Sequence, residues 1–339
     1  MKRIISLVLL LALLVTLPLF SACKKSDGTP EDNSPTSTEL DANLKINVWT
    51  LNGTTGFGMA PLMQNKADGK AALNYQFTVD TNATNVRDAL INGTADIGAV
   101  PTNVASMLYN LTEGDVVILA INTRGVLYLV ANTAKVAAPT SLADLSGKTV
   151  YVPAQNPTFI TKALIGAAGV ANVTINSTDY AEPAALQQAV AQGLVDYAIL
   201  PEPLLTVANA SRAEGVTLTT ALDVTAEWDK YFTAGSLVQG CVVARKEFVE
   251  KHPNEVAKFL EEYKASIEFV VANPAEASQM IVSAGIFAKA PVAEKAIPKC
   301  NLAFITGAEM KAAMQTFLAA MPAASIGGAL PADDFYFGA

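Results

Sequence analysis

The chain has 339 residues, of which 51% are hydrophobic and 16% are charged, so it carries enough apolar material for two packed cores. Its formal net charge of -8, with no basic run beyond the first three residues, excludes a function that depends on nucleic acid or another polyanion. A single histidine, His252, and three cysteines supply neither a metal centre nor a Ser-His or Cys-His nucleophile at the usual spacing. We therefore expect no metal, no cofactor and no catalysis.

The first residues have the pattern of an export signal. A basic start precedes a nearly unbroken apolar run over residues 4–20, and Ser-Ala-Cys23 closes it. Small residues before a cysteine resemble the lipobox of bacterial lipoproteins, which implies that Cys23 is lipidated and becomes the mature N-terminus. A transmembrane anchor and an ordinary secretory signal are the alternatives, and both would also export the chain.

Residues 1–22 are thus predicted to be a signal peptide, and residues 23–43 a lipidated cysteine and a flexible tether, because residues 24–41 are too polar to bury anything. The expected location is outside the cytoplasm, with the lipid anchoring the chain to the cell membrane. The other two cysteines, Cys241 and Cys300, are isolated in the sequence. We expect buried thiols there, with a disulfide as the alternative.

From Leu44 onward, short β-rich runs alternate with helical patterns. Strands are predicted at 45–51, 75–80, 95–100, 149–152, 173–176 and 197–200, and a longer β-rich segment at 116–132 is interrupted at 122–125. Helices are predicted at 58–66, 85–92, 102–109, 159–168, 183–192, 254–273 and 309–320. Repeated βα units predict an α/β fold with mainly parallel sheets and helices on both faces.

Two segments share one plan, which suggests two similar lobes. Residues 88–101 and 188–203 each contain an amphipathic helix, a glycine turn, an aspartate and a strand that ends at proline. The β-rich segments 116–132 and 236–248 would carry the chain out of one lobe and back, as two hinge crossings that permit closure over a ligand. The prediction is two doubly wound, Rossmann-like lobes: residues 44–124 and 239–339 in lobe I, and residues 125–238 in lobe II.

Five phrases, in this order, carry a family resemblance: INVWTLNGTTGFGMAPLM, NGTADIGAVPTNVAS, LADLSGKTVYVP, VDYAILPEPLL and FLEEYKASIEFVVANPAEAS. Over about residues 44–337 the chain resembles the type II solute-binding proteins of ABC importers, and within them the nitrate, sulfonate and taurine binders and the NMT1/THI5-like group. The resemblance implies the type II periplasmic-binding-protein fold, a small solute bound between the lobes, and delivery to a membrane permease. We expect a monomer that binds and does not catalyse.

Ligands of open α/β sheets gather beyond the carboxyl ends of the strands, and this rule selects candidate residues without help from the resemblance. The glycine-rich loop after the first strand suits polar or anionic groups, although its GxxGxG order differs from the dinucleotide pattern GxGxxG. Hydroxyls and amides after later strands offer further hydrogen bonds, with turns and helix caps as their alternatives. The candidate ligand-binding residues are Asn52, Gly53, Thr54, Thr55, Thr102, Asn103, Arg124, Asn156, Thr158, Glu202 and Gln239.

Two of these candidates are charged. Arg124 could hold a carboxylate, sulfonate or phosphate, with an ion pair to a nearby acid or solvent exposure as the alternatives. Glu202 stands between two prolines after a strand, where it could accept from an amine or a ring N–H, or simply lie in a stiff surface loop. The expected solute is a sulfonate, a nitrate-like anion, a taurine-like zwitterion, or a pyrimidine or other heterocycle.

Two other functions stay open at this stage. An enzyme on the same fold would resemble the pyrimidine-precursor synthases or menaquinone-pathway proteins, but the cysteine-rich CCCFC motif of the synthases is missing here. A ligand-sensing lipoprotein would bind the same kind of solute and signal to a membrane partner.

Overall fold

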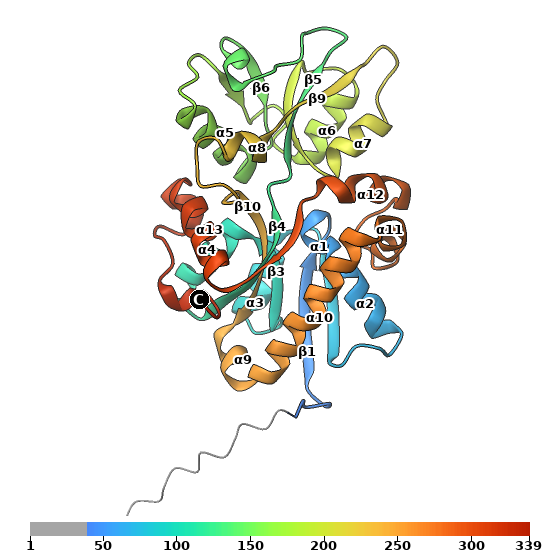
Figure 1. The fold of residues 1–339 in the computed structure, drawn as a ribbon, viewed down its shortest axis with the longest axis vertical. Helices are drawn as coiled ribbons and strands as arrows, with labels where there is room; N and C mark the ends of the chain where they lie inside the picture. Colours follow the sequence, from blue (N-terminus) through green and yellow to red (C-terminus); the bar gives the residue numbers. More distant parts are fainter. Residues whose placement is uncertain (1–38) are drawn as a thin grey trace, which may run out of the picture. The chain divides into compact units, whose positions relative to one another are not determined.

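The computed structural model describes residues 39–339, which form one compact unit (Figure 1). The predicted signal peptide, the lipidation of Cys23 and most of the predicted tether lie outside the described residues. No helix within residues 39–339 is both long enough and apolar enough to cross a membrane. The described chain contains two sheets, and we call each sheet with the helices packed on it a lobe.

Lobe I is built on a six-stranded sheet. In spatial order its strands are β11 (Leu302–Ile305), β4 (Val116–Arg124), β10 (Val238–Arg245), β3 (Ile97–Pro101), β1 (Lys45–Leu51) and β2 (Asn74–Asp80). Lobe II is built on a five-stranded sheet. Its order is β7 (Thr174–Asn176), β6 (Thr149–Tyr151), β8 (Tyr197–Pro201), β5 (Leu127–Asn132) and β9 (Leu218–Asp223).

Both sheets are mixed, which corrects the prediction of mainly parallel sheets. In lobe I, β1 is parallel to β2 and β3, whereas β10 is antiparallel to β3 and β4, and β11 is antiparallel to β4. In lobe II, β6 is parallel to β7 and β8, whereas β5 is antiparallel to β8 and β9. The antiparallel halves contain the strands that enter and leave each lobe. The α/β class with two sheets is confirmed.

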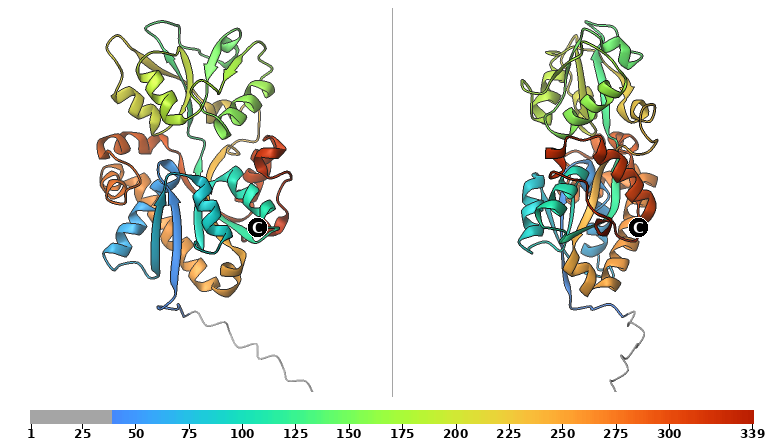
Figure 2. Two further views of the ribbon diagram at one scale, coloured as in Figure 1. Left: turned by 180° about the vertical axis from the view of Figure 1, so that it is seen from behind. Right: turned by 90° about the vertical axis from the view of Figure 1, so that its left-hand side faces the viewer.

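Helices cover the sheets, as the ribbon shows from three sides (Figures 1 and 2). Those of lobe I are α1 (Thr54–Phe57), α2 (Ala60–Ala67), α3 (Ala83–Ile91), α4 (Thr102–Leu111), α9 (Lys246–Lys251), α10 (Pro253–Ala272), α11 (Pro274–Ser283), α12 (Ala290–Ala296) and α13 (Gly307–Ala319). Those of lobe II are α5 (Asn156–Ala167), α6 (Pro183–Ala191), α7 (Leu204–Ala210) and α8 (Val224–Trp228). Short 3-10 turns are η1 (Leu142–Leu145), η2 (Ile297–Lys299), η3 (Ala323–Ile326) and η4 (Asp333–Phe335).

The chain crosses between the lobes twice, where β4 runs into β5 and where β9 and α8 lead back to β10 (Figure 1). Gly125 lies between β4 and β5, and a Cβ atom there would collide with the Thr225 hydroxyl and the Leu237 side chain. Next to the crossings the apolar core continues from one lobe to the other: the ring of Trp228 in α8 lies 6.1 Å from that of Phe317 in α13. The crossings are therefore packed on apolar side chains.

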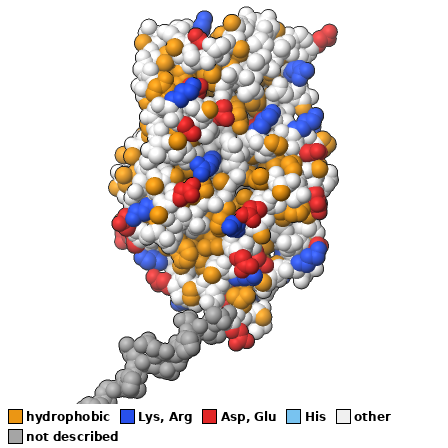
Figure 3. Space-filling model, viewed as in Figure 1, with side chains coloured by type: hydrophobic (Ala, Val, Ile, Leu, Met, Phe, Trp, Pro, Cys, Tyr) orange, Lys and Arg blue, Asp and Glu red, His pale blue; other side chains and the backbone are white. Residues whose placement is uncertain are grey.

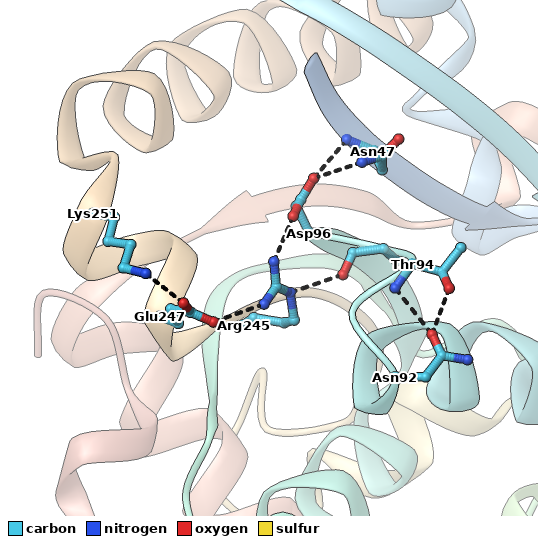
Figure 4. A network of polar contacts seen from close by, with 8 residues as sticks. Asn47, Asn92, Thr94, Asp96, Arg245, Glu247 and Lys251 are labelled. Carbon is cyan, nitrogen blue, oxygen red and sulfur yellow. Dashed lines mark hydrogen bonds and ion pairs between the residues drawn. The ribbon is translucent and has the colours of Figure 1, made fainter. Parts of the chain in front are cut away.

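A polar network at the end of lobe I away from lobe II ties three strands together (Figure 4). The Asp96 carboxylate accepts from the backbone N–H of Asn47 at 2.9 Å, from the Asn47 side chain at 3.0 Å and from Arg245 at 2.8 Å. Arg245 also pairs with Glu247 at 3.1 Å, and Glu247 pairs with Lys251. The network holds β1, β3 and β10 in register, and its residues face away from the contact between the lobes.

Candidate functional site

The two lobes meet through direct polar contacts at the carboxyl ends of β1 in lobe I and β8 in lobe II. The Thr54 hydroxyl, at the start of α1 in lobe I, donates to the backbone carbonyl of Glu202 in lobe II at 2.8 Å. The Tyr128 hydroxyl of lobe II donates to the backbone carbonyl of Lys299 in lobe I at 2.8 Å. Two predicted site residues, Thr54 and Glu202, are thus brought together from positions 148 residues apart.

The Glu202 carboxylate is buried between the lobes. The residue is only 2% exposed, and one carboxylate oxygen, Oε2, accepts from the backbone N–H of Thr206 in the first turn of α7 at 3.1 Å. The other oxygen, Oε1, has no hydrogen-bond partner among the described residues, and the nearest cation, Lys299 Nζ, is 3.9 Å away. That distance is too long for a hydrogen bond, so Oε1 is a buried acceptor without a donor.

Burial raises the pKa of the Glu202 carboxyl, and the Thr206 hydrogen bond and the charge of Lys299 offset only part of this effect. Burial also raises the pKa of the neighbouring Tyr128 hydroxyl, with the charges of Asp223 and Glu202 adding to the shift. The surroundings of Glu202 therefore disfavour the negative charge of its carboxylate. A hydrogen-bond donor on a bound molecule would stabilise that charge.

Both predicted buried cysteines are buried, unpaired thiols, so the alternative of a disulfide is wrong. Cys300 lies beside the contact between the lobes, with its Sγ 3.7 Å from the Thr54 hydroxyl, and burial raises its pKa to about 12. Cys241 lies in β10, where its Sγ is 3.5 Å from the carbonyl of Val100. A thiol with a raised pKa is protonated at neutral pH, so neither cysteine is an activated nucleophile.

The other candidates of the first loop lie close to Thr54. Asn52 and Gly53 hold the loop through their backbone N–H groups, which donate to Asp80 and Ile286 at 2.9 Å and 3.1 Å. Gly53 has a φ of 76°, a conformation that favours glycine, and Thr55 accepts from Asn122 through its carbonyl at 3.3 Å. This loop is thus placed at the lobe contact.

Several other candidates have partners within the protein. The Thr102 hydroxyl donates to the carbonyl of Val238 at 2.8 Å, and the Thr158 hydroxyl donates to the carbonyl of Pro153 at 2.7 Å. Gln239 accepts from the backbone N–H of Val126 at 2.7 Å. The hydroxyls of Thr102 and Thr158 and the Oε1 of Gln239 thus hold the crossings and the loop before α5.

Arg124 forms an ion pair with a nearby acid, Glu309, which was the alternative to solute binding. Its guanidinium donates to the carbonyl of Gly235 at 3.0 Å and pairs with Glu309 at 3.1 Å. Asn103 donates to the carbonyl of Ser325 at 3.3 Å, away from lobe II, and its Oδ1 has no partner among the described residues. Asn156, at the start of α5, likewise has a buried Oδ1 without a described partner.

A hollow of ≈ 420 Å³ lies beside Glu202, between α7 of lobe II and α12 of lobe I. It is lined by Thr206, Asn209, Ala210, Arg212, Pro291, Val292, Lys295 and Lys299. Two of these residues, Thr206 and Lys299, also flank the Glu202 carboxylate. Sequence reasoning missed the whole set. Lys295 lies in α12 and Lys299 in the turn η2 that follows, and no pattern in the sequence indicated that either would face lobe II.

No three histidine, cysteine, aspartate or glutamate side chains gather in residues 39–339 in a way that could hold a metal ion. The arrangement at the lobe contact can bind polar groups, because it combines a buried acceptor, a helix start and nearby cations.

Comparison with known proteins places the chain in a family. The model of the family described as NMT1/THI5 like matches residues 69–277. The chain belongs to the NMT1/THI5-like family. The match includes all the strands and helices of lobe II and the central strands β10 and β3 of lobe I, and with them Glu202, Thr206 and Arg212. A search of curated proteins gives no match.

Solved structures with the same fold include ABC transporter proteins. An ABC transporter protein from Parabacteroides distasonis is 24% identical, with a TM-score of 0.73 over 87% of this chain and 99% of that one. The periplasmic aliphatic sulphonate binding protein SsuA from Escherichia coli is 15% identical, with a TM-score of 0.64 over 81% and 85%. A ligand-binding component of an ABC-type import system from Staphylococcus aureus is 14% identical, with a TM-score of 0.63 over 86% and 96%.

Proposed function

We propose that this protein is an extracytoplasmic solute-binding protein of an ABC importer, anchored by lipid on Cys23, monomeric, and able to deliver its solute to a membrane permease. The NMT1/THI5-like family supports this proposal, and so does the likeness in fold to import-system proteins, one of them a sulphonate binder. The proposed site is the contact between the lobes around Thr54 and Glu202.

One observation carries the proposal: a buried carboxylate oxygen of Glu202 faces the lobe contact without a donor. A buried acceptor without a partner is costly, so the closed arrangement gains stability when a bound molecule supplies an N–H or O–H group. This chemistry favours a solute with at least one hydrogen-bond donor, such as an amine-bearing zwitterion or a heterocycle with a ring N–H. It disfavours nitrate, which has no donor.

The lobes have a route to open and close. Two crossings join them beside a continuous apolar core around Trp228. Away from that core, two hydrogen bonds connect the lobes, one from Thr54 to Glu202 and one from Tyr128 to Lys299. Breaking a few such bonds costs little compared with breaking a core, since each contributes about 0.5–1.5 kcal/mol net. A solute that contacts both lobes would shift the population toward the closed arrangement.

We propose a binding role and no catalysis at this site. Among the described residues the only thiol beside Thr54 has a pKa raised to about 12, which is the opposite of what a nucleophile needs. Within residues 39–339 the polar contacts of the Glu202 carboxylate are to Thr206 and Lys299, so no second acid is in contact with it to share acid and base roles.

The test is a melting-temperature screen of the purified chain against sulfonates, nitrate, amino acids, zwitterions, pyrimidines and flavins. The proposal predicts a rise of several degrees with one class, since a solute that binds only the folded state stabilises it. Glu202→Gln should weaken binding of that solute about tenfold or more. A flat response across the panel would contradict the proposed function, and unchanged affinity in Glu202→Gln would remove Glu202 from the site.

A further inference from the structure

The hollow between α7 and α12 has an unusual charge for this protein. Every charged residue that lines it is a cation: Arg212 comes from lobe II, and Lys295 and Lys299 come from lobe I. The chain as a whole has a formal net charge of -8. On the face shown in Figure 3, positive and negative side chains are interspersed. An all-cation lining in an acidic protein therefore needs an explanation.

Two of the three cations of the hollow, Arg212 and Lys295, form no ion pair among the described residues, whereas Lys299 pairs with Glu202 of lobe II. Lys295 forms no ion pair within residues 39–339. Arg212 donates one of its five N–H groups to the carbonyl of Asn209 at 2.8 Å, which leaves the others available. Lys299 lies 3.9 Å from the Glu202 oxygen that has no hydrogen-bond donor, and its side chain is 54% exposed.

A second observation points to a ligand. The Thr206 side chain lines the hollow and is 7% exposed, and its Oγ1 has no hydrogen-bond partner among the described residues. The remaining lining comes from Pro291, Val292 and Ala210, which are apolar. At ≈ 420 Å³, the hollow lies in the size range of small-molecule sites.

We propose that the α7–α12 hollow binds a small organic anion with two or more negative charges, gripped by Arg212 from lobe II and by Lys295 and Lys299 from lobe I. The inference rests on the proposed function and deepens it: the hollow would hold the anionic end of the solute, beside the Glu202 oxygen that takes its hydrogen-bond donor, and a disulfonate probes the hollow alone. The two unpaired cations, Arg212 of lobe II and Lys295 of lobe I, repel each other when nothing lies between them. An anion between them converts this repulsion into attraction to both sides, so the anion closes the lobes.

The anion is small and discrete. Three exposed cations without a long basic surface do not track a nucleic acid or a membrane, and the chain is acidic elsewhere. Because the cations remain in contact with water, the binding should weaken as salt is added.

The experiment is calorimetric titration of the purified full chain with ethane-1,2-disulfonate, and with ethanesulfonate as the singly charged control, at constant ionic strength. The proposal predicts saturable binding of the disulfonate that is about tenfold tighter than that of ethanesulfonate. Arg212→Ala and Lys295→Ala should each weaken disulfonate binding about fivefold or more. Lys264→Ala is the matched control for Lys295→Ala, since both lysines are exposed on helices of lobe I and Lys264 lies outside the hollow.

The outcomes separate this inference from the proposed function. No saturable disulfonate binding, or an equal loss in Lys264→Ala, overturns the anion site. If the melting screen finds a solute whose affinity does not change in Arg212→Ala and Lys295→Ala, the anion site is overturned and the solute-binding function stands. If no solute of the screen binds but the disulfonate binds with the predicted variant pattern, the anion site stands and the proposed function fails.

Discussion

The hydroxyl of Thr54 and the backbone carbonyl of Glu202 form a hydrogen bond of 2.8 Å between the two lobes. This bond joins the first turn after β1 to the proline-flanked loop after β8, and the side chain of the acceptor residue is the buried carboxylate of the candidate site. When the lobes separate, this hydrogen bond breaks and the surroundings of the Glu202 side chain change with it.

Replacing Thr54 with valine should favour the open arrangement, because the substitution keeps the shape of the side chain and removes one of the hydrogen bonds between the lobes. The expected loss of stability is about 1 kcal/mol. Thr158→Val is the matched control, since the Thr158 hydroxyl is equally buried but donates to Pro153 within lobe II. Small-angle scattering should detect a larger radius of gyration for Thr54→Val alone. An increase of the same size in both variants would contradict the role of Thr54 between the lobes.

Opening of the lobes should expose Cys300 before Cys241. Cys300 lies beside Thr54 at the contact between the lobes, whereas Cys241 lies inside the sheet of lobe I. We expect iodoacetamide to label Cys300 slowly in the native protein, with a bound solute slowing it further, and to leave Cys241 unlabelled until unfolding. Mass spectrometry of peptides distinguishes the two sites. Equal labelling of both thiols would indicate global unfolding and would argue against a separate opening step.

The stability difference between the wild type and Glu202→Gln should depend on pH in one direction. Burial raises the pKa of Glu202 above its ordinary value of 4.5, so the folded protein holds this proton more tightly than the unfolded chain. The stability that this protonation gives the folded state is fully present at pH values below the pKa of Glu202 in the unfolded chain. It is lost as the pH rises through the raised pKa of Glu202 in the folded protein. Glutamine does not titrate, so the wild type should lose stability relative to the variant as the pH rises, and then level off. Denaturant unfolding of both proteins across that range measures the difference. A difference that grows in favour of the wild type with rising pH would refute the raised pKa.

Asp96→Asn should destabilise lobe I by about 2–3 kcal/mol, because the carboxylate that accepts from Asn47 and Arg245 is lost in a mostly buried position. Glu247→Gln is the control in the same network, and since Glu247 is 60% exposed it should change stability by less than about 1 kcal/mol. Thermal unfolding measures both. The solute affinity of Asp96→Asn should stay unchanged, since the network faces away from the contact between the lobes, and a strong loss of affinity would contradict that separation.

Much of the fold could be predicted from the sequence, because its strands are marked by local patterns. The predicted strand at 45–51 coincides with β1, and the predicted break at 122–125 falls where β4 ends and β5 begins. β9 was missed because its sequence, LTTALD, is only partly buried and does not alternate clearly. The parallel pairs of β1 and β6 were predicted, but the antiparallel halves were missed, because a strand pattern indicates which residues are buried and contains no information on the direction of the neighbouring strand.

The site was only partly predictable, for a related reason. The rule that ligands gather at strand ends selected Thr54 and Glu202, which do meet. It also selected Thr102, Thr158 and Gln239, whose polar groups are used inside the protein. The cations of the α7–α12 hollow could not be found, because they come from segments of different lobes and meet only after both lobes have folded. The predicted residue ranges of the two lobes stay a prediction.

The central claim is that the two lobes close on a solute, and the most direct measurement is the distance between them. Spin labels at Lys70 in lobe I and Lys148 in lobe II, both exposed, report that distance by double electron–electron resonance. The account predicts a broad distribution without solute and a narrower, shorter one with the solute that raises the melting temperature. A distribution that stays the same when that solute saturates the protein would contradict closure between the lobes.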